Sequence, residues 1–333
     1  MFKTVLSGLY FLLWRLRIFL YEHRVIAQKK VNCFVVSIGN LTMGGTGKTP
    51  TTLFLAQQYQ SRGVRVGIVS RGYKGQYKES VVVVSDGITV LESPETVGDE
   101  PVLMAKRLNG VPIAVSRDRA LGCQWLIDHF KVQVILLDDG FQHLRLHRDF
   151  NILLIDTTQT NYDLLPKGPM REPLAAASRA DVILLTRWDD SSSPFHRPFA
   201  ATIPVIQTSF SPLELIHIPS GGTRPVSTLF GEPIVAVCGI GNPNAFIKML
   251  EQLGAKICQT VFFSDHFYYT AADIQKIESA RKTLGATSLV TTEKDAIKIE
   301  RFSSVSIDIW ALRIQMTFLS PPEQWENLLF NAS

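Results

Sequence analysis

The sequence predicts an α/β protein in which helices flank a parallel sheet. Three observations support this class. Short apolar, β-branched runs alternate with helix-length segments along most of the chain, the pattern of βαβ units. A Gly-rich loop, residues 39–47, separates the first of these runs from a following helix. Hydrophobic residues make up 46% of the 333 residues and charged residues 19%, which allows about two domains with cores and excludes a disordered chain.

The first half of the chain contains the clearest strand–loop–helix–strand unit. Residues 31–38 form a β-branched and aromatic run, typical of a buried strand. A helix follows over about 48–61, and Gly63 is its expected end. Helices fit between several of the later apolar runs, so we expect helices on both faces of the sheet. Those later strands are predicted at 64–69, 111–115, 132–137, 152–155 and 182–185.

The second half predicts a smaller α/β domain. Its expected elements are a strand 234–238, a helix 245–253, a strand 256–263, a helix 271–284, strands 288–292 and 306–312, and a helix 322–330. Segments 189–197 and 212–225 are rich in Ser, Pro and Gly, which predicts loops and a domain boundary. We therefore expect an N-terminal helix over 1–30, a main domain over 31–215, the smaller domain over 216–303, and a C-terminal strand and helix over 304–333 that return to the main domain.

Basic charge is concentrated at the N-terminus. Residues 1–30 carry a net charge of +5 and the rest of the chain −1, so nucleic acid is not an expected partner. The apolar run 5–14 is too short to span a bilayer, which needs about 20 apolar residues. An apolar face opposite basic residues predicts an amphipathic helix in a membrane interface; a helix packed on its own domain is the alternative. At helical spacing the apolar face holds Val5, Leu9, Leu12, Leu13, Leu16, Phe19 and Leu20.

The Gly-rich loop carries the strongest chemical signal. It reads Thr42-Met43-Gly44-Gly45-Thr46-Gly47-Lys48-Thr49. A Gly-Lys-Thr end between a strand and a helix is the context of a phosphate-binding P-loop, in which backbone N–H groups and the helix dipole hold phosphates. Lys48 would reach the β- and γ-phosphates of ATP, and the Thr49 hydroxyl would bind Mg²⁺. Thr42 departs from the usual pattern, which has Gly there, and a generic Gly-rich turn is the alternative.

A second signal is the pair Asp138 and Asp139 at the end of the apolar run 134–137. An acid at the carboxyl end of a buried strand is the Walker B arrangement, and such strand ends face the nucleotide crevice. The pair predicts a Mg²⁺ site, although either carboxylate can be the direct ligand. The alternative is an Asp-rich junction between a strand and a turn.

Phosphoryl transfer to an alcohol also needs a proton acceptor and cations for the moving charge. Asp99, in Gly98-Asp99-Glu100-Pro101, stands at a predicted helix start, where a helix N-cap is the alternative role. Arg119 follows a predicted strand, and Arg171 lies in a Pro- and Gly-containing loop with charges of both signs. Both arginines are candidate catalytic cations, with solvated loops as the alternative.

Taken together, these motifs resemble the tetraacyldisaccharide 4′-kinase family of Gram-negative bacteria. The segments that carry the resemblance are 37–50, 70–73, 98–101, 138–143, 239–243, 265–266 and 292–296, in this order. Thr42 is itself typical of that family. The resemblance implies a P-loop kinase domain and a smaller α/β domain joined by a hinge. It also implies that Asp99 is the catalytic base and that His266, in the smaller domain, assists it, which requires the domains to close over the substrate.

The resemblance further implies a lipid kinase of lipid A biosynthesis. The expected reaction is ATP-dependent, Mg²⁺-assisted phosphorylation of the 4′-hydroxyl of an acylated glucosamine disaccharide 1-phosphate, giving lipid IV-A. The expected location is the cytoplasmic face of the inner membrane, held there by the N-terminal segment. Two alternatives stand beside this one. A deviant P-loop ATPase of the partitioning or metallochaperone type usually has Lys where Met43 stands, and a membrane-bound nucleotide switch would bind nucleotide without phosphorylating a lipid.

Overall fold

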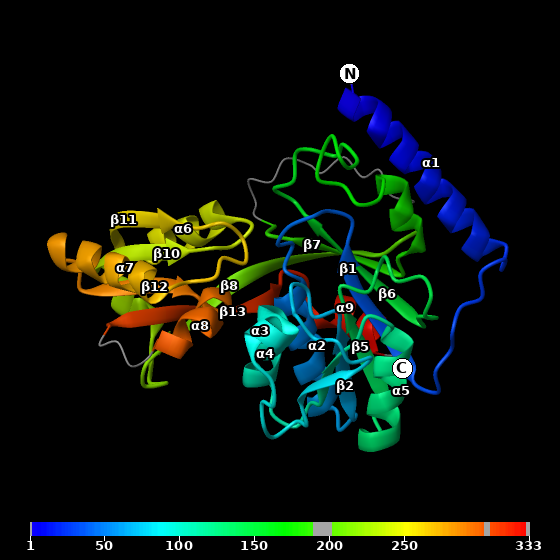
Figure 1. Cartoon of the computed structure of the whole chain (residues 1–333), viewed down its shortest axis with the longest axis horizontal. Coiled ribbons are helices and arrows are strands. Elements are labelled where there is room, and N and C mark those ends of the chain that lie inside the picture. The colour runs from blue at the N-terminus through cyan, green and yellow to red at the C-terminus, as the bar shows by residue number, and fades with distance from the viewer. Residues whose placement is uncertain (1, 189–201, 303–306, 331–333) are drawn as a thin grey trace. The chain divides into compact units, whose positions relative to one another are not determined.

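The computed structural model describes residues 2–188, 202–302 and 307–330 and divides into two compact units (Figure 1). Unit 1 comprises residues 1–210 and 316–333, and unit 2 comprises residues 211–315. The chain leaves unit 1 within β8 (Val205–His217) and returns within β13 (Ile309–Phe318). Both crossings lie inside strands. The sequence-based boundaries were 215/216 and 303/304. The second of these and the whole of the expected loop 189–197 lie outside the described residues.

Unit 1 is built on a sheet with the strand order β3-β4-β2-β5-β1-β6-β7-β8, in which the pairing of β3 with β4 is antiparallel and the others are parallel. β1 lies between β5 and β6, and Val35, Val36 and Ile38 are each at most 1% exposed. Burial on both faces explains the continuous apolar run of this strand. The strands not yet given are β1 (Phe34–Asn40), β2 (Val66–Ser70), β3 (Val82–Ser85), β4 (Ile113–Val115), β5 (Val134–Asp138), β6 (Phe150–Asp156) and β7 (Val182–Thr186).

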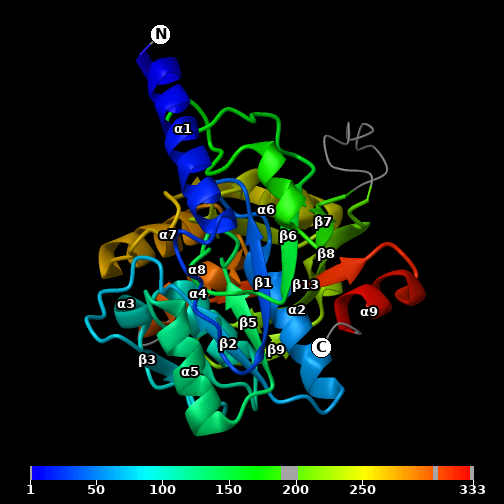
Figure 2. The same cartoon turned by 90° about the vertical axis from the view of Figure 1, so that its right-hand side faces the viewer.

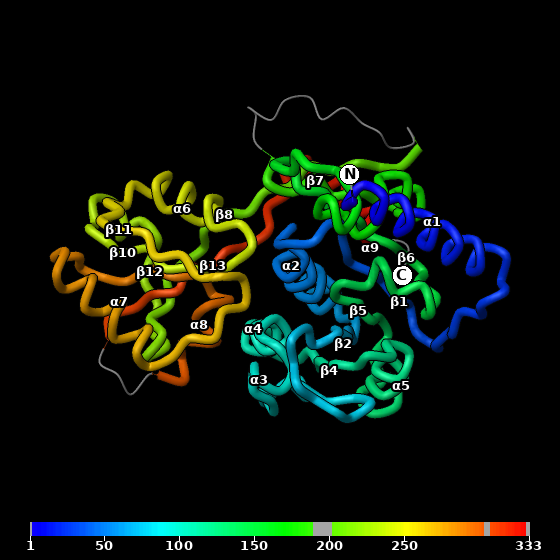
Figure 3. The backbone as a smooth tube through the Cα atoms, turned by 45° about the horizontal axis from the view of Figure 1, so that its top comes forward, coloured from blue at the N-terminus to red at the C-terminus, as the bar shows by residue number. Residues whose placement is uncertain are grey.

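Helices cover the two faces of this sheet. Figure 3 shows α2 (Lys48–Ser61) and α5 (Arg119–Phe130) on opposite sides of β2 and β5. Cys123 and Leu126 of α5 pack against alternate strand residues, such as Val35 and Ile135, because successive strand side chains point to opposite faces. The other short helices of this part of the chain are α3 (Pro94–Val97), α4 (Asp99–Arg107) and η1 (Leu174–Arg179).

The C-terminal helix α9 (Pro322–Phe330) lies beside α2 (Figure 2). The Tyr59 hydroxyl donates to the Leu329 carbonyl at 3.1 Å. The Arg62 guanidinium lies 4.1 Å from the Phe330 ring centre, and the rings of Phe54 and Trp325 are 5.7 Å apart. These contacts make the end of the chain part of the core around the P-loop helix.

The N-terminal helix α1 (Phe2–Glu22) has 21 residues, none of them buried. Among the described helices it is the one long and apolar enough to cross a membrane, judged by length and composition alone. The expectation that this segment is too short to span was therefore wrong. The helix continues through Arg15 and Arg17, whose long side chains can carry their charge away from apolar surroundings. Its exposed large apolar side chains are Phe2, Val5, Leu9, Leu12, Leu13, Leu16 and Phe19.

Unit 2 contains parallel strands in the order β11-β10-β12-β13, and β9 pairs antiparallel with the end of β8. The segment 212–225, predicted as a loop, is largely strand: Leu215 pairs with Arg224 and is fully buried. The sheet environment overrides the local Pro and Gly content. The predicted strand 306–312 begins at Ile309 instead. The remaining elements are β9 (Thr223–Arg224), η2 (Val226–Leu229), β10 (Pro233–Cys238), α6 (Pro243–Gln252), β11 (Lys256–Phe262), α7 (Ala271–Thr283), β12 (Ser288–Thr292), α8 (Glu293–Ile299) and η3 (Glu300–Phe302).

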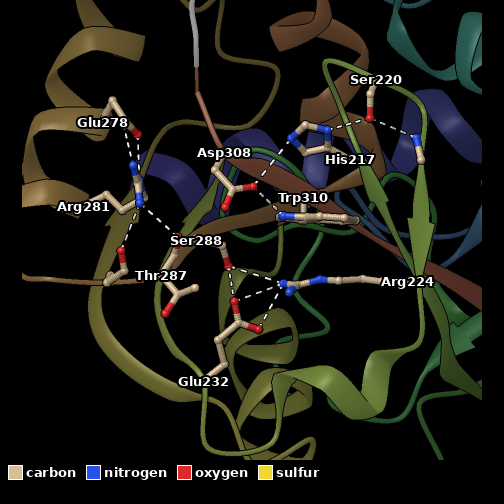
Figure 4. A network of polar contacts seen from close by, with 12 residues as sticks. His217, Ser220, Arg224, Glu232, Glu278, Arg281, Thr287, Ser288, Asp308 and Trp310 are labelled. Carbon is tan, nitrogen blue, oxygen red and sulfur yellow. Dashed lines mark hydrogen bonds and ion pairs between the residues drawn. The ribbon is translucent and has the colours of Figure 1, made fainter.

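A polar network closes the edge of unit 2 where β10 and β12 begin (Figure 4). The Arg224 guanidinium lies 4.3 Å from the Trp310 ring centre and donates to Glu232 Oε1 at 3.2 Å. Ser288 Oγ donates to the same oxygen at 2.8 Å. The network thus ties β9, β12 and β13 together at the end of the sheet opposite the carboxyl ends of its strands.

Candidate active site

In unit 1 polar side chains gather where the parallel strands end. Asn40, Ser70, Asp138, Asp156 and Thr186 are the last residues of β1, β2, β5, β6 and β7, and each is at most 9% exposed. The carboxyl edge of a parallel sheet is where α/β proteins bind their ligands. The candidate site is therefore at this edge, with the Gly-rich loop between β1 and α2 above it.

The Gly-rich loop is held in shape by Asn40. Its side-chain amide donates to Thr46 Oγ1 at 2.8 Å and to Thr42 Oγ1 at 3.3 Å. Thr42, the departure from the usual P-loop pattern, is thus an internal support of the loop. Gly47 is the N-cap of α2 with φ of 92°, and it has no side chain to cover the free N–H groups of the first helical turn. Those N–H groups are suited to bind phosphate.

Lys48, Asp139 and Arg171, all predicted from the sequence, lie together. Lys48 Nζ is 3.6 Å from Asp139 Oδ1. The Arg171 guanidinium donates to both carboxylate oxygens of Asp139, at 3.0 and 2.9 Å, and to the Thr42 carbonyl at 3.1 Å. Burial opposes ionisation of Asp139, but Lys48 and then Arg171 hold its pKa well below the usual range. Asp139 is therefore a fixed anion that holds two cations beside the loop.

Asp138 has a different environment although it is adjacent in sequence. It is 1% exposed, and Ser70 Oγ donates to its Oδ2 at 2.9 Å. Its Oδ1 is buried and has no hydrogen-bond partner among the described residues. Burial, followed by the charges of Glu100 and Asp139, raises the pKa of Asp138 to about 7. A buried carboxylate oxygen without a donor fits a small divalent cation, which prefers oxygen ligands.

Asp99 is the first residue of α4 and is 5% exposed. The N-cap of this helix is Gly98, so Asp99 does not have the N-cap role that was its alternative. Its Oδ1 accepts from the Glu100 N–H at 3.1 Å. Because Glu100 is one of the charges that raise the pKa of Asp138, the start of α4 belongs to the same electrostatic environment as the metal candidates.

Arg119 is the first residue of α5 and is also 5% exposed. One of its terminal nitrogens donates to the Ser116 and Arg117 carbonyls at 3.3 Å, and its buried Nε has no partner within the part of the chain that the structure describes. Burial and the neighbouring Arg71 lower its pKa, while Asp139 acts in the opposite direction. Arg119 is thus a buried cation facing the carboxylates, and not a solvated loop residue.

In unit 2, three motif segments meet after the ends of β10, β11 and β12. His266, with φ of 59°, has Nε2 3.0 Å from Lys294 Nζ, and Lys294 is 3.3 Å from Asp265 Oδ1. The Gly239 N–H donates to Asp295 at 2.9 Å. The segments 239–243, 265–266 and 292–296 therefore form one cluster. His266 belongs to unit 2 and Asp99 to unit 1, so their pairing stays a prediction.

The family follows from comparison with known proteins. The family model described as tetraacyldisaccharide-1-P 4′-kinase matches residues 1–332. The chain belongs to this family. A tetraacyldisaccharide 4′-kinase of Syntrophus aciditrophicus is 37% identical over 93% of this chain and 86% of its own length. Another from Geobacter metallireducens is 38% identical over 96% of this chain and 94% of its own length.

Solved structures give the same assignment. A crystal structure of LpxK from Aquifex aeolicus in complex with ATP is 31% identical and covers 100% of this chain and 99% of its own, with a TM-score of 0.81. The predictions of the family, of the α/β fold with a P-loop kinase domain, and of a lipid kinase are confirmed. Family membership favours the kinase over the ATPase of partitioning type and over the nucleotide switch.

Four further residues join the candidate site of this 4′-kinase family member without having been assigned roles from the sequence. Asn40 supports the loop, Ser70 holds Asp138, and Lys294 contacts His266. Arg187 donates to the Gly45 carbonyl at 2.6 Å and forms an ion pair with Asp156. A signal existed for three of them, because Asn40, Ser70 and Lys294 lie in the segments 37–50, 70–73 and 292–296 that carry the family resemblance. No spacing in the sequence connects Arg187 with the loop 142 residues before it.

Proposed function

We propose that this protein transfers the γ-phosphoryl group of ATP to the 4′-hydroxyl of a tetraacylated glucosamine disaccharide 1-phosphate, giving lipid IV-A. The observation that carries the proposal is the group formed by Lys48, Arg171 and Asp139 beside a Gly-rich loop, in a chain of the tetraacyldisaccharide-1-P 4′-kinase family. A related kinase, LpxK from Aquifex aeolicus, has been crystallised in complex with ATP, which supports ATP as the phosphate donor.

The phosphates bind to the loop 42–47 and the first turn of α2. Lys48 and Arg171 hold positive charge beside the loop, and Arg119 adds a third cation, which is buried. Charge on the transferring phosphoryl group spreads over its equatorial oxygens, so fixed cations stabilise the transition state without reorganising. Asp139 orients Lys48 and Arg171, since both are in contact with its carboxylate.

Thr49, Asp138 and Asp139 would hold Mg²⁺. The unpartnered Oδ1 of Asp138 favours Asp138 as the direct ligand, because both oxygens of Asp139 already accept from Arg171. A divalent cation held by these residues would supply positive charge against the charge that develops on the phosphate oxygens. Ionisation of Asp138, whose pKa is raised by burial, is favoured when a cation is present.

Asp99 is the proposed base. Its carboxylate takes the proton of the 4′-hydroxyl while the hydroxyl oxygen bonds to the γ-phosphorus and the bond from that phosphorus to ADP breaks. Its burial at the start of α4 supports the role, because a buried base is held in one orientation. His266 is the proposed partner of Asp99. Its contact with Lys294 keeps the imidazole beside a cation, and closure of the two domains over the substrate would complete the pair.

We further propose that α1 holds the kinase on the cytoplasmic face of the inner membrane of a Gram-negative bacterium. Its exposed apolar side chains form one stripe, and Lys3, Arg15 and Arg24 are exposed basic residues in or next to the helix. Apolar burial together with attraction to anionic lipids is the energy source of interfacial helices. A lipid substrate requires the kinase to stay at the membrane, because the acyl chains remain in the bilayer while the sugar is phosphorylated.

The test is a phosphoryl-transfer assay with labelled ATP and the disaccharide 1-phosphate in detergent. We expect a labelled lipid from the full chain and a fall in turnover of several orders of magnitude in Lys48→Ala, because that variant removes charge stabilisation from the transferring group. Lys276→Ala, which changes an exposed lysine of α7 outside the motif segments, is the matched control. Nucleotide binding without a labelled lipid, or normal turnover in Lys48→Ala, contradicts the proposal.

A further inference from the structure

One side of α1 faces its own unit through three polar side chains, each bonded to a main-chain carbonyl. Ser7 Oγ donates to the Leu164 carbonyl at 2.9 Å, the Tyr10 hydroxyl donates to the Arg171 carbonyl at 2.6 Å, and the Arg17 guanidinium donates to the Gln142 carbonyl at 2.8 Å. Ser7, Tyr10 and Trp14 recur at helical spacing, and Trp14 packs against the core cluster that contains Leu41, Phe141 and Met170. The helix therefore has an inner stripe distinct from its exposed apolar stripe.

The carbonyl that accepts from Tyr10 belongs to Arg171, whose guanidinium contacts the candidate site. Arg171 reaches Asp139 with two hydrogen bonds and the Thr42 carbonyl with a third, and it also donates to Asn40. Its main-chain N–H donates to the Leu41 carbonyl at 2.7 Å. The guanidinium of this residue is thus held by Asp139, Asn40 and the Thr42 carbonyl, and its main-chain carbonyl is held by Tyr10 of α1.

A second series of hydrogen bonds connects α1 with the Gly-rich loop. Gln142, whose carbonyl accepts from Arg17, donates through its side-chain amide to the Asn40 carbonyl at 2.7 Å. Asn40 supports the Gly-rich loop through Thr46. Two hydrogen bonds from α1 therefore reach the site. One ends on Arg171, a cation beside the phosphate-binding loop, and the other ends on Gln142, which contacts the loop support Asn40.

We propose that Tyr10 is a positioning residue for phosphoryl transfer: its hydroxyl holds the Arg171 main chain, so that seating of α1 on unit 1 sets the guanidinium on Asp139 and on the loop. The inference rests on the proposed function, because it concerns the rate of that reaction. It extends the role of α1, which acts on the catalytic step as well as on membrane attachment. A bilayer that buries the exposed apolar stripe would stabilise the seated helix, and the kinase would be most active where its lipid substrate is.

The central test is Tyr10→Phe in the full-length protein, which removes one hydroxyl and keeps the ring. We expect kcat to fall about three- to tenfold, the range for the loss of one net hydrogen bond, while KM for the lipid and binding to anionic vesicles stay unchanged. Tyr21→Phe, which removes the same hydroxyl near the other end of α1, is the matched control and should keep the wild-type kcat.

A double-mutant comparison separates positioning from general stability. If Tyr10 acts through Arg171, Tyr10→Phe should have no further effect on kcat once Arg171→Ala has removed the guanidinium. If Tyr10 only stabilises the helix, Tyr10→Phe should lower kcat by the same factor, or the melting temperature by the same amount, in the wild type and in Arg171→Ala. A wild-type kcat in Tyr10→Phe, or fully additive losses in the double variant, overturns the inference. Lack of lipid phosphorylation by the wild-type chain instead refutes the proposed function, so the two failures are distinguishable.

Discussion

The Gly-rich loop offers a test in which the steric cost can be worked out in advance. A Cβ on Gly47 would lie 2.0 Å from Cζ of Phe210, and the backbone φ there is 92°. A Cβ on Gly44, with φ of 114°, would meet nothing within 4 Å. Gly44→Ala therefore carries conformational strain alone, whereas Gly47→Ala carries strain and an overlap.

The two costs differ in size. A left-handed backbone costs a non-Gly residue about 1–2 kcal/mol. If this whole cost is taken from the free energy of ATP binding, the affinity falls about 5- to 30-fold. Carbon atoms pack at about 3.5–4 Å, so the Phe210 ring would have to move by about 1.5–2 Å. Overpacking of this kind adds about 1–3 kcal/mol. Gly47→Ala should then lose about 30-fold to several thousand-fold. The ring also lies 5.8 Å from the Arg187 guanidinium, whose hydrogen bond to the Gly45 carbonyl would be disturbed.

The assay is titration calorimetry with a non-hydrolysable ATP analogue, with the melting temperature of each variant as the control for folding. Adding Phe210→Ala to Gly47→Ala should restore affinity to about the level of Gly44→Ala, because the overlap is gone and the strain remains. Equal affinities of the two single variants, with no recovery in the double variant, would refute the reasoning about Phe210.

The other predictions concern the base, the metal, the membrane helix and acid stability. Asp99→Ala should lower kcat while leaving the Mg²⁺ requirement unchanged, and combined with His266→Ala it should cost much less than the product of the single effects, both measured by steady-state kinetics. Asp138→Ala should raise the Mg²⁺ concentration needed for half-maximal activity. Deletion of residues 1–24 should release the protein from sedimenting membranes; continued sedimentation would place the anchor elsewhere. Burial and then Arg119 lower the pKa of His143 to about 4, so its neutral form is favoured in the folded state. The neutral imidazole therefore contributes to the free energy of unfolding above about pH 6.5. This contribution is about 3 kcal/mol at most and is lost as the pH drops toward 4. His143→Gln should reduce the fall of the melting temperature over that pH range.

Much of the main unit could be predicted because its signals lie in consecutive residues. The apolar run 31–38, the loop that follows and the helix from Lys48 form a strand–loop–helix unit, and local backbone preference is enough to recognise it. The apolar length of α1, although not the helix itself, and the strand at 212–217 were misjudged for the opposite reason. Arg15 and Pro212 look like interruptions locally, but helix continuation and sheet pairing with β9 override a single residue.

The sequence by itself determined which chemistry the chain carries: a phosphate-binding loop, a Lys, a pair of acids at a strand end, and the motifs of one kinase family. Only the tertiary structure decided how those groups divide the work. Asp138 and Asp139 are neighbours in sequence, yet Arg171 neutralises one of them and leaves the other with an unpartnered oxygen. Likewise, only the fold brings Tyr10 to the carbonyl of Arg171. The physical reason is that a motif follows from the conformations of a few adjacent residues, whereas a charge partner depends on which distant loops meet at the edge of the sheet.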